Sequence, residues 1–137
     1  MEQAEFQIAD IPVNADTAKS AGRLFWKLMA LWQMTPKDQA LLLGVKFHAT
    51  KLKTWMREGR IPEDPDKLMR VGHLAGIHKN LRILLPYNRR AVYEFMKTPQ
   101  SFLLHGKTPI DLIREGGEFN SYANIAAIRR HLDQLRV

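Results

Sequence analysis

A cluster of basic and hydroxyl residues between positions 46 and 57 is the part of the chain whose residue types most clearly point to chemistry. Lysine and arginine side chains bind phosphate oxygens and guanine edges, and threonine hydroxyls donate to or accept from bases. The candidate DNA-contacting residues are Lys46, His48, Thr50, Lys51, Lys53, Thr54 and Arg57. The same pattern also fits an ordinary helix whose basic face is only solvated, and sequence leaves both interpretations open.

The net charge is concentrated in the same part of the chain. The 137 residues carry a formal charge of +7. Residues 1–16 contain four acidic residues and no basic one, whereas residues 17–60 contain nine basic and two acidic residues. Concentrated positive charge favours a polyanionic partner, because neutralising phosphates releases counterions.

Helical spacing of apolar residues runs through almost the whole chain, and no convincing two-residue alternation occurs. The sequence therefore predicts an all-α protein of about seven helices. We expect an N-terminal helix-turn-helix bundle packed against a C-terminal helical domain. The predicted division is a flexible acidic arm (1–15), a helix-turn-helix region (16–60) and a C-terminal domain (61–137), with a hinge at 59–65. The predicted helices begin near residues 16, 35, 48, 66, 88 and 109, and a last one begins at Asn120 or Ser121.

Two predicted helices around Gly44 have a helix-turn-helix layout, in which the second helix enters the major groove. Ala40 and Gly44 are four residues apart, as close packing of the two helices requires. The second helix is predicted to bury Leu52, Trp55 and Met56. Leu52 lies eight residues after Gly44 and Trp55 eleven, about two more than in short units of this kind. We therefore expect a longer turn around residues 46–49.

A second well-defined segment lies at residues 106–117. Gly106 permits a tight turn, Thr108 is placed as a helix N-cap, and Pro109 is the first helical residue. Asp111 completes a short variant of the capping box. Gly116-Gly117 then ends a helix of about two turns. Such a short helix needs tertiary packing, so we interpret the segment as a fixed structural platform.

The last predicted helix carries Ile125, Ile128, Leu132 and Leu135 at spacings of three, four and three residues, a narrow apolar seam. Its end is either the last packed turn of the core or a segment inserted into a partner. Sequence favours the core for Ile125 and Ile128 and leaves residues 135–137 open.

Catalytic and metal-binding patterns were not found, so we predict that the chain is not an enzyme and needs no cofactor or metal. It has no cysteine. The five histidines form no ligand pattern, and His73 and His78, five residues apart, do not share a helix face. No apolar run approaches the roughly 20 residues of a membrane span. The first 15 residues are too acidic for a signal peptide, so a cytoplasmic location without membrane contact is expected.

Several motifs occur in the order typical of one known family. They are Trp32, Leu41-Leu42-Leu43-Gly44-Val45, Leu52-Lys53-Thr54-Trp55, and Gly106-Lys107-Thr108-Pro109-Ile110-Asp111-Leu112-Ile113. From about residue 32 to residue 137 the chain thus resembles the Xre/MbcA/ParS antitoxins of RES–Xre toxin–antitoxin systems. The last motif is the most specific.

The resemblance implies that the N-terminal half binds operator DNA and represses its own operon. It implies that the C-terminal half forms a homodimer and neutralises a RES-domain toxin, which consumes NAD or ADP-ribosylates a target, by blocking its active site. The end of the chain would then contact the toxin through Arg129, Leu135, Arg136 and Val137. The alternatives are a helix-turn-helix transcriptional regulator without a toxin, and an antitoxin that no longer binds specific DNA.

Overall fold

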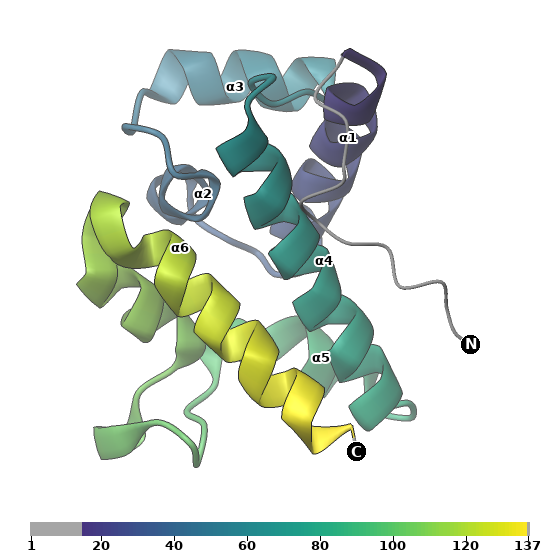
Figure 1. The fold of residues 1–137 in the computed structure, drawn as a ribbon, viewed down its shortest axis with the longest axis vertical. Helices are drawn as coiled ribbons and strands as arrows, with labels where there is room; N and C mark the ends of the chain where they lie inside the picture. The colour runs from purple at the N-terminus through teal and green to yellow at the C-terminus, as the bar shows by residue number, and fades with distance from the viewer. Residues whose placement is uncertain (1–14, 137) are drawn as a thin grey trace.

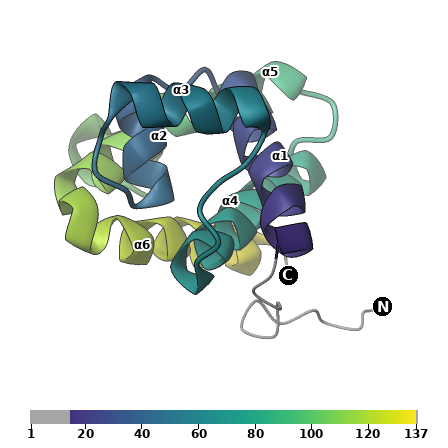
Figure 2. The same cartoon turned by 90° about the horizontal axis from the view of Figure 1, so that it is seen from above.

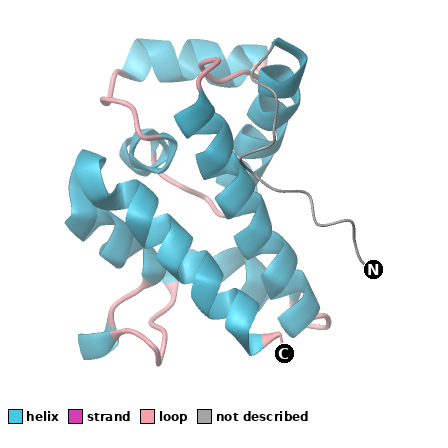
Figure 3. Ribbon diagram, viewed as in Figure 1, coloured by secondary structure: helices cyan, strands magenta, loops and turns pink. Residues whose placement is uncertain are grey.

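Six α-helices make up most of residues 15–136, which are the residues that this computed structural model describes. They are α1 (Ala15–Leu31), α2 (Pro36–Leu43), α3 (Ala49–Glu58), α4 (Pro65–Leu84), α5 (Arg89–Glu94) and α6 (Pro109–Leu135). Short 3-10 turns at Phe95–Lys97 and Leu104–Gly106 lie between α5 and α6. These residues contain no strand (Figures 1 and 3), which confirms the all-α prediction. The predicted arm lies outside the described residues, except for Ala15 at the start of α1.

A kink at Gly117 explains why there are six α-helices in this range and not about seven. Gly117 has φ 61° and ψ −165°, which are not helical values. The two predicted C-terminal helices are therefore the two arms of α6, and they meet at Gly117, where the sequence predicted that the first of them ends. The side-chain amide of Asn124 donates to the carbonyl oxygen of Leu112 at 2.9 Å and ties the two arms together across the kink.

One hydrophobic core joins the two predicted halves of the chain. Phe25 of α1, Leu42 of α2, Ile77 of α4 and Ile125 of α6 are all fully buried within it. Helices α4 and α6 lie side by side, and α1 and α2 pack behind them (Figure 1). The predicted boundary at residue 60 falls in the loop before α4, but the core continues across it. None of the described helices combines the length and apolar character that crossing a membrane requires.

Helix α3 lies at the edge of this core and crosses over α2, with α1 beside its C-terminal end (Figure 2). Leu52 is buried and Trp55 is partly buried against the core, as predicted. Met56 is 49% exposed, so the prediction that it is buried is wrong. The reason is geometric: at about 100° per residue Met56 lies roughly 100° from Trp55, on the far side of Leu52.

The predicted platform at residues 106–117 has the expected caps. The Thr108 hydroxyl accepts from the Asp111 amide at 3.2 Å, and the Asp111 carboxylate accepts from the Thr108 amide at 3.1 Å. Pro109 begins α6, and Gly106 has φ 69°. The two bonds from Thr108 hold the pKa of Asp111 below its usual value, with a smaller contribution from Arg114. This start of α6 is therefore fixed locally, as the sequence predicted.

Candidate nucleic-acid interface and polar junction

Helices α2 and α3 cross as the two helices of a helix-turn-helix unit do. In Figure 1, α2 is viewed along its axis while α3 is viewed from the side. Thr35 caps α2 by accepting from the Asp38 amide at 3.2 Å, and Gly44 ends it with φ 74°. The next helical residue is Ala49, so residues 44–48 form the longer turn that the spacing predicted.

The predicted DNA-contacting residues lie along one surface formed by this turn and α3. Six of them are exposed and Thr54 is half-buried; the exposed ones are Lys46, His48, Thr50, Lys51, Lys53 and Arg57. The Nδ1 atom of His48 accepts from the Lys51 amide at 3.3 Å and so caps α3. This bond places the ring proton on Nε2, which can donate to a ligand outside the helix.

The cations of this surface have no acidic partner among the described residues. Lys46, Lys51, Lys53 and Arg57 form no ion pair within residues 15–136. Seven other basic residues do: Arg60, Lys67, Arg70, Arg90, Lys107, Arg114 and Arg129. A phosphate group can therefore bind at α3 without breaking an internal ion pair.

Phe47 is a surface residue that sequence reasoning missed. Its side chain is 42% exposed in the turn, and the Lys37 ammonium lies 6.0 Å from its ring centroid. An aromatic residue inside a basic, elongated turn was the signal that could have identified it. Flat rings of this kind offer a stacking surface beside phosphate-binding cations.

The end of α3 is anchored to α1. The indole Nε1–H of Trp26 donates to the Arg60 carbonyl oxygen at 2.9 Å. A Cβ atom on Gly22 would lie 2.5 Å from the Cα atom of Arg60, so the two backbones are in close contact. The position of α3 is thus set by a hydrogen bond and by the lack of a side chain at residue 22.

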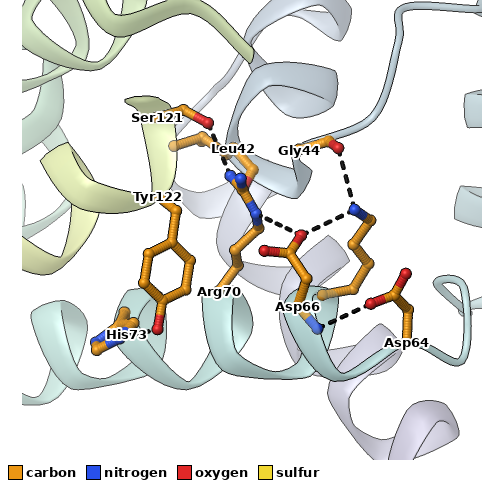
Figure 4. A network of polar contacts seen from close by, with 9 residues as sticks. Leu42, Gly44, Asp64, Asp66, Arg70, His73, Ser121 and Tyr122 are labelled. Atoms are coloured by element: carbon orange, nitrogen blue, oxygen red, sulfur yellow. Dashed lines mark hydrogen bonds and ion pairs between the residues drawn. The ribbon is translucent and has the colours of Figure 1, made fainter. Parts of the chain in front are cut away.

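A buried polar junction joins α2, α4 and α6 around Arg70 (Figure 4). The guanidinium of Arg70 donates to Asp66 Oδ2 at 2.9 Å, to Ser121 Oγ at 2.8 Å and to the Leu42 carbonyl oxygen at 3.4 Å. Lys67 donates to the Gly44 carbonyl oxygen at 3.1 Å and to the same carboxylate at 2.8 Å. Arg70 is only 4% exposed.

The carboxylate of Asp66 is stabilised in its charged form by two neighbouring cations, Lys67 and Arg70. Burial raises the pKa of Asp66, but the hydrogen bonds and charges of Lys67 and Arg70 outweigh that effect, and the net pKa is lowered. Asp38 of α2, itself buried, pairs with Arg114 of α6 at 2.7 Å. This hydrogen bond is the main cause of the raised pKa of Arg114. Helix α2 is therefore joined to α6 by two separate polar contacts, one through Arg70 of α4 and one between Asp38 and Arg114.

The predicted toxin-contacting residues are not equivalent. Arg129 donates to the Gly72 carbonyl oxygen at 3.4 Å, and its side chain packs over Gly76 on α4. Leu135 is 55% exposed. Arg136 is also exposed, and its Nη1 donates to Asn80 Oδ1 at 2.8 Å. Val137 lies outside the described residues, so the exposed end of α6 is represented by Leu135 and Arg136.

Two of the five histidines, His73 and His78, have side-chain partners within the protein. His73 Nε2 lies 3.0 Å from the Tyr122 hydroxyl, and the ring of His78 stacks with Tyr93 at 6.3 Å. Burial lowers the pKa of both; Arg129 adds to this effect at His73, and Arg82 and Lys27 add to it at His78. Within residues 15–136 no three histidine, aspartate or glutamate side chains are grouped so that they could hold a metal ion.

Comparison with known proteins finds a relative of similar length. An uncharacterized protein, y4oB, of Sinorhizobium fredii is 28% identical over 125 residues, which cover 90% of this chain and 91% of that protein. No protein-family model and no solved structure matches. The chain is therefore similar over nearly its full length to a protein of comparable size.

Proposed function

We propose that this protein is a DNA-binding antitoxin of a type II toxin–antitoxin system. It represses its own operon through α3 as a homodimer and neutralises a RES-domain toxin through the exposed end of α6. The observation that carries the proposal is the basic surface formed by the turn at residues 44–48 and by α3, which crosses α2. Lys46 in the turn and three cations on α3, Lys51, Lys53 and Arg57, form no ion pair within residues 15–136. The motif at residues 106–113, which resembles that of the antitoxin family, forms the start of α6 and supports the second part.

Removing two charges from α3 tests DNA binding. Lys53→Gln together with Arg57→Gln should weaken binding to the operon's own promoter roughly 10- to 100-fold and reduce the slope of log affinity against log salt by about two. Both side chains are exposed, so folding should be unaffected. Fluorescence anisotropy at several salt concentrations measures both quantities.

The matched control is Arg130→Gln with Gln134→Glu, which removes the same net charge from exposed positions on α6. It should leave the salt slope nearly unchanged. Equal losses for the two double variants would show that only total charge matters, and the α3 assignment would be wrong.

Adding a charge at the end of α6 tests toxin neutralisation. Leu135→Glu should reduce co-purification with a co-expressed RES-domain toxin at least 10-fold and abolish protection of the cells, because an exposed apolar contact would become a carboxylate. Gln134→Glu, at the neighbouring exposed position, is the control and should still protect. Full protection by Leu135→Glu, with a lowered cellular NAD level only in cells lacking the antitoxin, would contradict this contact.

A further inference from the structure

Four cations outside α3 lie along one side of the bundle and have no ion-pair partner within residues 15–136. They are Arg23 and Lys27 on α1, Arg82 in the last turn of α4, and Arg89 at the start of α5. All four are exposed. We call these four residues the flanking strip.

The strip begins beside α3. Gly22 of α1 contacts the backbone of Arg60, and the Cγ atom of Arg23 lies 3.6 Å from the position of a Cβ atom on Gly59, which caps the end of α3. Figure 2 shows the same meeting of α1 with the C-terminal end of α3. The part of α1 that carries Arg23 is therefore in direct contact with the C-terminal end of α3.

The strip continues from α1 to α4 and α5. Helix α1, which carries Lys27, packs against α4, which carries Arg82. The pKa of His78 on α4 is lowered by burial first and then by the charges of Arg82 and Lys27. Arg82 and Arg89 line one cavity of about 250 Å³, which has no acidic residue in its lining. The nearby Glu94 is already paired with Arg90 at 3.0 Å. The local charge of the strip is thus uncompensated.

The spacing of the cations on α1 suits the phosphates along one strand of a DNA duplex. Arg23 and Lys27 are four residues apart, or about 6 Å along the helix, close to two phosphate steps of about 3.4 Å each. The 17 residues of α1 span about 25 Å, which corresponds to about seven base pairs of duplex.

We propose that the flanking strip binds backbone phosphates of duplex DNA beyond the segment that α3 contacts, so that this protein engages a longer duplex than α3 alone can cover. This inference rests on the proposed DNA binding by α3. Because phosphate contacts carry no base information, the strip adds affinity and salt dependence but little sequence preference.

The test compares two duplexes that share the same central promoter sequence. The shorter duplex contains only the base pairs that α3 contacts. The longer duplex has about ten further base pairs on each side. For the wild-type protein, the longer duplex should bind roughly 10- to 100-fold more tightly, with a salt slope steeper by about two. Lys27→Gln with Arg82→Gln should remove this gain, whereas Arg130→Gln with Gln134→Glu should retain it. Equal wild-type affinity and slope on both duplexes would overturn the proposal.

A site-specific measurement separates phosphate contact from a general effect on folding. On the longer duplex the pKa of His78 should rise, because a phosphate offsets the charges of Lys27 and Arg82; NMR titration measures this, with His78→Asn assigning the signal. An unchanged pKa would contradict the contact.

If the Lys27→Gln/Arg82→Gln variant binds DNA normally but loses the toxin, the strip binds an acidic protein, and the proposal is wrong. If Lys53→Gln with Arg57→Gln has no effect on either duplex, it is the α3 assignment that fails.

Discussion

Replacing Arg70 with methionine should lower the free energy of unfolding by about 2–4 kcal/mol and the melting temperature by roughly 10 °C. Arg70 of α4 is 4% exposed, and it donates to Asp66 of the same helix, to Leu42 of α2 and to Ser121 of α6. Methionine can fill much of the same volume but donates no hydrogen bond. The Ser121 hydroxyl, which is fully buried, is then left without this partner. Urea denaturation followed by circular dichroism measures the change.

The double variant Arg70→Met with Ser121→Ala isolates the cost of the unpaired hydroxyl. Removing both partners of a buried hydrogen bond costs less than removing one, because no polar group remains desolvated and unbonded. The double variant should therefore recover about 1 kcal/mol relative to Arg70→Met alone. A neutral effect of Arg70→Met would show that the junction contributes little to stability. A double variant that is no more stable than Arg70→Met would show that the unpaired Ser121 hydroxyl is not the source of the loss.

Local features of this fold were predictable from the sequence because their causes lie within a few residues. The capping box needs only Thr108 and Asp111 three positions apart, and the end of α2 needs only a glycine that tolerates positive φ. Helical spacing also identified most of the core. The all-α class and the longer turn before α3 followed from these local signals.

The contacts between helices could not be predicted in the same way. Arg70 and Ser121 are 51 positions apart, and Asp38 and Arg114 are 76 apart, so no periodicity links them. In the sequence Arg70 appears as one more base of a long helix, and only its burial shows that it joins three helices. The packing of Arg129 on α4 was missed for the same reason. Candidate DNA contacts were easier to identify, because exposed charge on one helix is itself a local property.

Replacing Gly22 with alanine should destabilise the protein, although alanine is the better helix former. In the interior of an isolated helix this change would stabilise by about 1 kcal/mol. Here the new Cβ atom would lie 2.5 Å from Arg60 Cα, 2.7 Å from Gly59 O and 2.9 Å from Arg60 C, all of them backbone atoms. No side-chain rotation relieves these contacts, so the end of α3 must move away from α1. We expect a net loss of about 2–4 kcal/mol in unfolding free energy.

Gly76→Ala provides the matched control, because it is the same substitution inside another helix. The three heavy atoms nearest to its Cβ atom would all belong to the side chain of Arg129, the first of them Nε at 2.5 Å, and a long flexible side chain can move. The gain in helix propensity should offset much of the lost contact, so the change in stability should be within about 1 kcal/mol of zero. Similar losses at both glycines would show that backbone contact does not set the position of α3. A large loss confined to Gly22→Ala, together with weaker promoter binding per folded molecule, would mean that the contact between α1 and the loop after α3 holds the DNA-binding surface in place.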